Sequence, residues 1–197
     1  MARNAAEILR DILSDSAIVK PVVRRDGCQD ISLFSGRRRI TVLDVPENTI
    51  VVNMQTAPPK TGRMFLQEKN ARLIGCYVFA GTDERDRLDK FEKTPGGGDF
   101  MVFVETNDAP SQQSETERRL RAAVCVMDYC AAVGREFCGV MDLFGGYKRR
   151  FVKIKARGRV NRRFNFSRRL AANDSPSNPR MLEGDQIPFR YFAAQRP

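Results

Sequence analysis

The sequence predicts an α+β fold: a single domain in which a mixed or antiparallel β-sheet is covered by two helices, at about 4–14 and 114–137. Three observations predict it. The chain opens with an amphipathic segment, several short apolar runs follow at strand length, and a long stretch of helical periodicity comes in its second half. The length of 197 residues, with 42% hydrophobic and 29% charged residues, suits one globular domain over 1–197.

The first helix is expected over residues 4–14. Its apolar residues recur at helical spacing, and charged residues lie between them. The apolar set is Ala5, Ile8, Leu9 and Ile12. Pro21 discourages helix beyond that point. We expect Ile8, Leu9 and Ile12 to pack onto the sheet that follows.

Four extended segments are expected between the helices. Residues 30–43 are expected to form extended structure with a turn at Gly36 and Arg37 to Arg39. The β-branched run 49–54 (TIVVNM) is typical of a buried strand. The apolar runs 73–80 (LIGCYVFA) and 100–104 (FMVFV) predict two further core strands.

The second helix is expected at 114–137. Ser114 and Glu117 form the S-x-x-E pattern that often precedes a helix. Apolar residues then recur at helical spacing and should face the sheet. These residues are Leu120, Val124, Met127 and Ala131.

The C-terminal part is expected to form a basic β segment over 147–170 and a closing strand over 187–193. Phe151, Lys153 and Lys155 alternate with small or apolar residues, which predicts one face in the core and one face carrying charge outward. Pro188 cannot donate to a β-ladder, so the closing strand is expected at a sheet edge.

The charge is concentrated in the same segment. Residues 1–146 hold 20 basic and 21 acidic residues, whereas residues 147–197 hold 14 basic and 3 acidic ones. Such a field attracts a phosphate backbone or an acidic protein, and the sequence leaves both open. The candidate residues that face this partner or DNA are Lys148, Arg149, Arg150, Lys153, Lys155, Arg157, Arg159, Arg162 and Arg163.

The composition argues against an enzyme. The chain has no histidine, which removes the common nucleophile–histidine systems and histidine-dependent zinc sites. The stretch 103–108 (FVETND) loosely resembles the acidic strand of metal nucleases through Glu105 and Asp108, but Asn107 stands where a basic residue would be needed. We therefore expect no catalytic residue, no cofactor and no metal site.

The five cysteines predict reduced thiols. Their number is odd and they include no C-x-x-C pair, so we expect no obligatory intrachain disulfide. The chain also contains no apolar run of the roughly 20 residues that a membrane span needs, and its start does not resemble a secretory signal. We expect synthesis in a cytoplasm that keeps thiols reduced, and no membrane partner.

The opening stretch AAEILRDILSDSAIVKPVVRR resembles the first helix of tail-terminator and tail-completion (neck) proteins of tailed bacteriophages. The later order is similar too: a strand with polar residues after it (FMVFVETNDAPSQQS), a long helix, a strand pair and a final strand. The resemblance in element order covers most of the chain, and the resemblance in residues covers about 5–25. The loop 82–98 and the basic segment 147–170 make the chain larger than a minimal terminator.

The resemblance implies a structural virion protein that forms a hexameric ring, terminates the tail tube and joins it to the neck or head. Its implied partners are copies of itself, the adjacent tail tube or sheath, and neck or head-completion proteins. Contact with DNA in the channel is a further implication. The alternative from another class is a basic nucleic-acid-binding protein or a small viral coat protein, which would also explain the basic segment.

Overall fold

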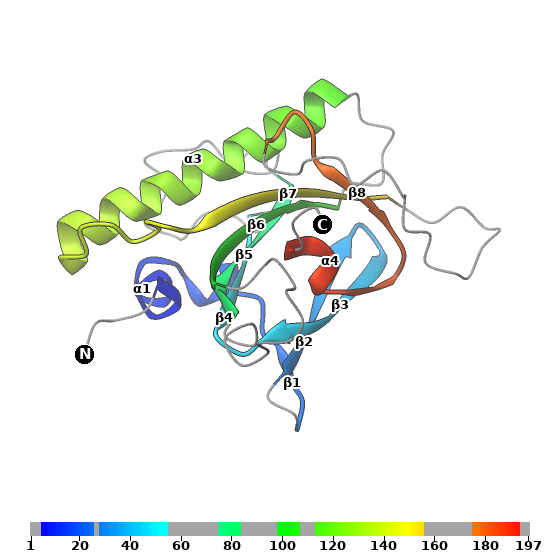
Figure 1. Cartoon of the computed structure of the whole chain (residues 1–197), viewed down its shortest axis with the longest axis horizontal. Coiled ribbons are helices and arrows are strands. Elements are labelled where there is room, and N and C mark those ends of the chain that lie inside the picture. Colours follow the sequence, from blue (N-terminus) through cyan, green and yellow to red (C-terminus); the bar gives the residue numbers. More distant parts are fainter. Residues whose placement is uncertain are drawn as a thin grey trace, which may run out of the picture.

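The chain folds into three layers: two helices, a central sheet and a second sheet beneath it (Figure 1). The structure is a computed structural model, and it describes residues 5–25, 28–54, 75–83, 98–106, 113–155 and 175–193. The strands within these ranges form one sheet of five and one sheet of four. Both sheets are mixed, so the predicted α+β class is confirmed, whereas the second sheet was not foreseen.

The five-stranded sheet forms the middle layer. Its strands are β4 (Thr49–Asn53), β5 (Cys76–Asp83), β6 (Gly98–Glu105), β7 (Lys148–Lys155) and β8 (Arg180–Glu183), in that spatial order. The pairs β4–β5 and β5–β6 are antiparallel, and β6–β7 and β7–β8 are parallel. A parallel pair needs a crossover connection, and the long helix provides the one between β6 and β7.

Helices α1 (Ala5–Ile12) and α3 (Gln113–Cys138) cover one face of this sheet, within one or two residues of the predicted bounds. Leu9 of α1 and Leu120 of α3 share a buried cluster with Val78 of β5. Ile8 instead packs with Leu143, after α3, and Ile12 is only half-buried. The expectation that Ile8 lies on the sheet is therefore wrong.

Ile8 packs elsewhere because α1 lies close to α3. At Gly134, a Cβ atom would lie 3.1 Å from Leu143 Cδ2 and 3.6 Å from Ile8 Cγ2. Those distances leave little room for a side chain at this position. The missing side chain therefore allows the end of α3 to approach α1. No described helix is both long and apolar enough to span a membrane.

The four-stranded sheet packs against the other face of the central sheet. Its order is β1 (Val22–Val23), β2 (Cys28–Ser35), β3 (Arg38–Pro46) and β9 (Gln186–Pro188). Strands β2 and β3 form a hairpin over the extended segment expected at 30–43, and Gly36 turns it with φ 58°. Arg38 and Arg39, expected in the turn, instead pair with Ser35 and Phe34 as part of β3. Alternate residues of this hairpin are fully buried against the central sheet: Ile31, Leu33, Ile40 and Val42.

The predicted closing strand at 187–193 is confirmed only in its first part. Strand β9 pairs in parallel with β3 at the edge of the four-stranded sheet, as Pro188 indicated. The chain then turns into α4 (Arg190–Ala193), where Phe192 N–H donates to Phe189 C=O at 2.8 Å. This turn places both rings around Phe79, with centroid distances of 5.9 and 6.0 Å. Burial of both rings at helical spacing overrides the strand-like composition.

Candidate functional site

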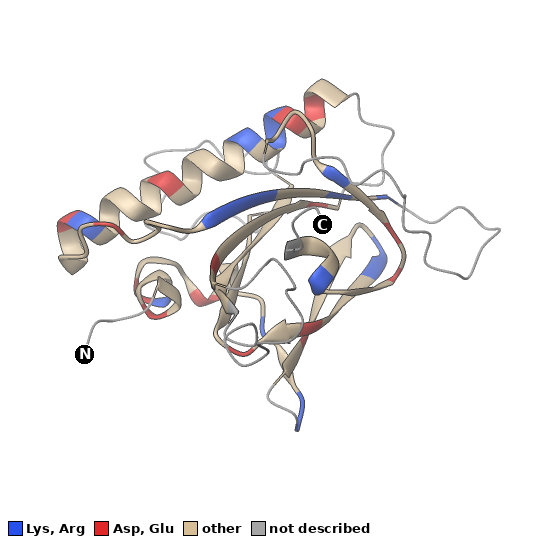
Figure 2. Cartoon of the chain, viewed as in Figure 1, with Lys and Arg blue, Asp and Glu red and all other residues tan. Residues whose placement is uncertain are grey.

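Strand β7 carries the described part of the predicted basic set (Figure 2). Lys148 and Lys155, at the two ends of the strand, are exposed. They are seven residues apart, which corresponds to about 23 Å along a strand and to opposite faces of the sheet. The described residues therefore do not form one continuous basic face. Arg157, Arg159, Arg162 and Arg163 lie outside the described residues.

The two arginines of β7 are half-buried rather than fully presented to solvent. Arg149 forms an ion pair with Asp128 of α3, with its guanidinium 2.6 Å from Asp128 Oδ1. Arg150 points from the opposite face, and its Nη1 donates to the Arg149 carbonyl at 3.0 Å. The Arg149 charge is thus paired within the molecule, where it ties β7 to the helix.

Lys153 does not face outward, so that part of the prediction is wrong. It is 8% exposed, and its Nζ lies 3.2 Å from Glu105 Oε2 and 2.6 Å from Thr116 Oγ1. The alternation was read correctly, but both faces of β7 are covered. Helix α3 lies over the face with Lys153, and the four-stranded sheet lies over the other. On the helix face Phe151 stacks on Phe103 with a centroid distance of 5.1 Å.

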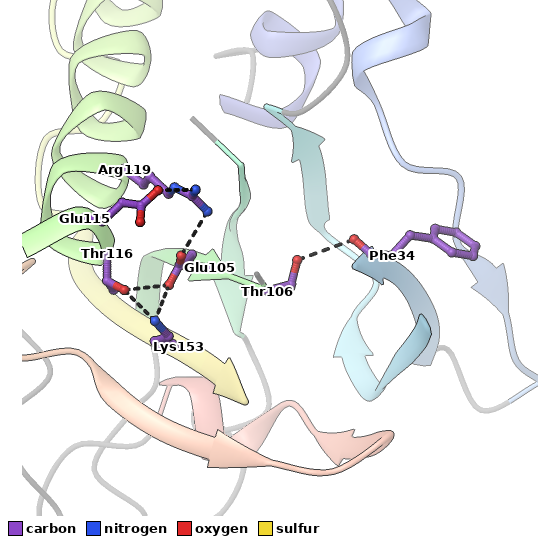
Figure 3. Close-up of polar contacts among 7 residues, drawn as sticks. All are labelled: Phe34, Glu105, Thr106, Glu115, Thr116, Arg119 and Lys153. Carbon is purple, nitrogen blue, oxygen red and sulfur yellow. Dashed lines mark hydrogen bonds and ion pairs between the residues drawn. The ribbon is translucent and has the colours of Figure 1, made fainter. Parts of the chain in front are cut away.

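Glu105 is the centre of this buried polar cluster, which joins β6, β7 and α3 (Figure 3). Its carboxylate is fully buried. Thr116 Oγ1 donates to Oε2 at 3.0 Å, and Arg119 Nη1 lies 3.3 Å from Oε1. Arg119 also pairs with Glu115 one turn earlier on α3. Two positive and two negative side chains therefore compensate one another beneath the helix.

The chemistry of this cluster is that of a structural ion-pair network. Taking charges out of water costs several kcal/mol per ion, and the cost is offset only when each charge has well-placed partners. Glu105 has Lys153, Arg119 and Thr116 around it. The carboxylate that suggested a nuclease in 103–108 is Glu105, and both of its oxygens are already occupied by cations. It is therefore not open to a metal ion from solvent. Asn107 and Asp108 lie outside the described residues, and the described ranges contain no group of three or more metal-ligating side chains.

The structure exposes two surface features that the sequence did not single out. Phe137, at the end of α3, and Met141, in the turn that follows, are 84% and 83% exposed. On β2, buried and partly exposed residues alternate, and Phe34 is 52% exposed at an outward position. The alternation of β2 was a signal for Phe34, because its neighbours Leu33 and Ile31 clearly belong to the core.

The five thiols divide by environment. Cys76 and Cys130 are buried, Cys28 and Cys138 are intermediate, and Cys125 is exposed; all five are free. Burial raises the pKa of the Cys130 thiol from its ordinary 9.0 to about 11. It also raises the pKa of Cys76, where the nearby Glu105 carboxylate adds to the effect. Cys125 and Cys130 thus point to different sides of α3, as their spacing predicts.

Comparison with known protein families, curated proteins and solved structures finds no match for this chain.

Proposed function

We propose that the chain is a structural virion protein of a tailed bacteriophage, located at the junction of tail and neck. Copies of it form a ring, expected to be hexameric, that terminates the tail tube and joins it to the neck or head. The observation that carries the proposal is the placement of α1 and α3 together on one face of a mixed sheet, in the order helix, strands, helix, strands. The resemblance of residues 5–25 to terminator proteins implies that order.

The apolar residues near the end of α3 support self-assembly. Phe137 and Met141 are four residues apart and lie almost wholly outside the core. Large apolar side chains that lie together on a surface are typical of contact sites between proteins, and we propose that these two belong to one such patch. In a ring of identical copies, each copy would cover these side chains with a second surface of its neighbour. We assign this end of α3 to the contact between subunits.

The exposed lysines of β7 support the contact with a different partner. Lys148 and Lys155 are charged at the surface, whereas Lys153 forms a buried ion pair with Glu105. Charge complementarity steers encounter and fixes register between proteins. Because the two lysines lie at opposite ends of β7, the proposal assigns them to two acidic surfaces, those of the adjoining tail-tube and neck proteins.

The test reverses the charges of the exposed lysines in the phage that encodes the protein. Lys148→Glu with Lys155→Glu should leave the subunit folded and block the joining of heads to tails, so that negative-stain microscopy shows the two separately. Lys148→Arg with Lys155→Arg is the matched control and should give complete virions. Intact, infectious virions from the charge-reversed variant would remove these lysines from the joining step. Lys153 is left unchanged because a glutamate there would place a second carboxylate beside Glu105.

One observation favours the alternative, a small viral coat protein: two sheets pack face to face around the second buried cluster. Coat proteins of the jelly-roll type are built from two such sheets. Their strands are antiparallel, however, whereas β6–β7, β7–β8 and β3–β9 are parallel pairs. The ring protein therefore remains the better-supported function.

A further inference from the structure

The turn end of the β2–β3 hairpin presents an aromatic ring beside arginines on the outer face of the four-stranded sheet. Phe34 is 52% exposed, and Arg39 is its direct partner across the two strands. Directly opposite residues on one face of a sheet have Cβ atoms about 5 Å apart. Arg37 is exposed in the turn between them. This surface is separate from β7 and from the end of α3.

Phe34 is held in place by the other sheet. Its N–H donates to Tyr77 Oη at 2.9 Å, and the Tyr77 hydroxyl donates to its C=O at 3.1 Å. Thr106 Oγ1 donates to the same carbonyl at 3.4 Å, and Figure 3 shows the Phe34 ring pointing away from that contact. Burial raises the pKa of Tyr77, so its hydroxyl stays protonated as the donor. The ring is thus exposed on a backbone that is already ordered, which lowers the entropy lost when a partner binds.

The charges around Phe34 favour an anionic partner. Arg39 Nε donates to Ser32 Oγ at 3.0 Å, which orients its guanidinium along the outer face. Arg38 points to the side of the hairpin, where it pairs with Asp185 at 2.7 Å. The Asp185 carboxylate, which lies near this turn, is therefore compensated by Arg38. Arg39, directly opposite Phe34, and Arg37, in the adjoining turn, add positive charge to this end of the hairpin.

An aromatic face flanked by positive charges matches the chemistry of a single-stranded nucleic acid. Unpaired bases stack on aromatic side chains, and every base offers such a face whatever the sequence. Flanking arginines compensate the phosphates on each side of the stacked base. A duplex keeps the faces of its bases inside the stack, so it offers phosphates to the arginines but no base face to Phe34. We infer that the β2–β3 hairpin binds single-stranded nucleic acid, with a base on Phe34 and phosphates at Arg37 and Arg39. This inference stands independently of the ring.

The test measures binding of the full chain to fluorescent oligonucleotides of about 12 nucleotides, using single-stranded DNA, single-stranded RNA and duplex DNA over a salt series. We expect at least one single strand to bind more tightly than the duplex. Phe34→Leu should weaken this binding roughly 10-fold, as expected for the loss of one stacked base. Arg37→Ala with Arg39→Ala should lower the slope of log affinity against log salt by about 1.4, or about 0.7 for each phosphate contact.

The matched control removes the same amount of charge elsewhere, with Lys148→Ala and Lys155→Ala. The Phe34→Leu effect should persist in that background. Thermal unfolding of Phe34→Leu should match the parent chain, because the changed side chain is outside the core. The inference is overturned if neither single strand binds at low salt, if the duplex binds as tightly, or if the control variant loses binding while both hairpin variants keep it. Tighter binding of either single-stranded DNA or single-stranded RNA supports the site, and the comparison shows which of the two sugars it prefers.

Discussion

Glu105 illustrates how a single residue changes the interpretation of a segment. In the sequence it stands in a stretch that loosely resembles an acidic nuclease strand. In the fold it is fully buried, and its partners come from β7 and α3. Each partner supplies a donor to a carboxylate that is closed off from the solvent. The cluster fixes α3 over the sheet, and this placement is what the proposed function rests on.

The ion pair between Glu105 and Lys153 predicts a large effect on stability. Glu105→Gln leaves the Lys153 ammonium buried without its carboxylate, and we expect the free energy of unfolding to fall by about 3–5 kcal/mol. Urea denaturation followed by circular dichroism measures this change. Lys155→Met, at an exposed position of the same strand, should change stability by less than about 0.5 kcal/mol.

Adding Lys153→Met to Glu105→Gln completes the comparison. With both charges removed, part of the lost stability should return, and the coupling between the two sites should be about 0.5–3 kcal/mol. If Glu105→Gln costs no more than Lys155→Met, the buried pair contributes nothing to holding the three elements together.

The buried thiol of Cys130 predicts a loss of stability at high pH. The folded chain keeps this proton up to a pKa of about 11, whereas the unfolded chain releases it above its ordinary 9.0. The unfolded state therefore binds fewer protons in that window. The contribution of Cys130 to the free energy of unfolding is therefore constant below pH 9. It falls as the pH rises toward 11, by at most about 1.4 kcal/mol per pH unit.

Denaturant unfolding between pH 8 and 11 tests this pH dependence. Cys130→Ala should flatten the curve, and Cys125→Ala, at an exposed position, should leave it parallel to the parent. A residual slope of the same sign is expected from Cys76, whose pKa is also raised by burial. Parallel curves for Cys130→Ala and the parent chain would show that Cys130 does not cause the slope.

At the scale of elements, fewer residues of α1 pack against the central sheet than its apolar periodicity predicted. Leu9 is fully buried in the cluster between the helices and the central sheet, whereas Ile12, the last residue of α1, is half-buried. Leu9→Ala should lower stability by about 2–5 kcal/mol because it leaves a cavity in the core. Ile12→Ala should cost clearly less. Thermal and urea unfolding of the two variants measure the difference, and equal losses would contradict the assigned orientation of α1.

Much of the element order could be predicted because local patterns determine it. The β-branched run of β4 and the long periodicity of α3 each indicate one kind of element, whatever surrounds them. The pairing of β9 with β3 could not be predicted, because it joins segments from opposite ends of the chain. The burial of Lys153 has a different cause, because α3 covers its face of β7. The sequence predicted the helix but did not show which face of this strand it would cover. A lysine faces outward only if nothing packs on its side of the sheet.

At the scale of the whole molecule, the layered fold separates three surfaces. The end of α3 exposes Phe137 and Met141, the ends of β7 expose lysines, and the β2–β3 hairpin exposes Phe34. None of these surfaces could be read from composition alone, because exposure depends on which faces the layers cover. In the proposed ring, the first surface binds a second copy and the second binds a neighbouring virion protein.

The assembly surface predicts the effect of removing its apolar side chains. Phe137→Ser with Met141→Ser should leave the subunit folded and shift it toward the monomer, because neither side chain contributes to the core. Val22→Ser with Val23→Ser removes two exposed apolar side chains from β1, in another layer, and should leave the oligomer intact. Size-exclusion chromatography with light scattering measures both variants. An unchanged oligomer in the first variant would exclude this end of α3 from the contact.

Negative-stain microscopy of the purified chain, at the concentrations used for light scattering, tests the central claim most directly. The proposed function predicts closed rings of a single stoichiometry with a central channel, and their loss in the Phe137→Ser, Met141→Ser variant. Particles that remain monomeric at every concentration, or that form open and irregular chains, would contradict it.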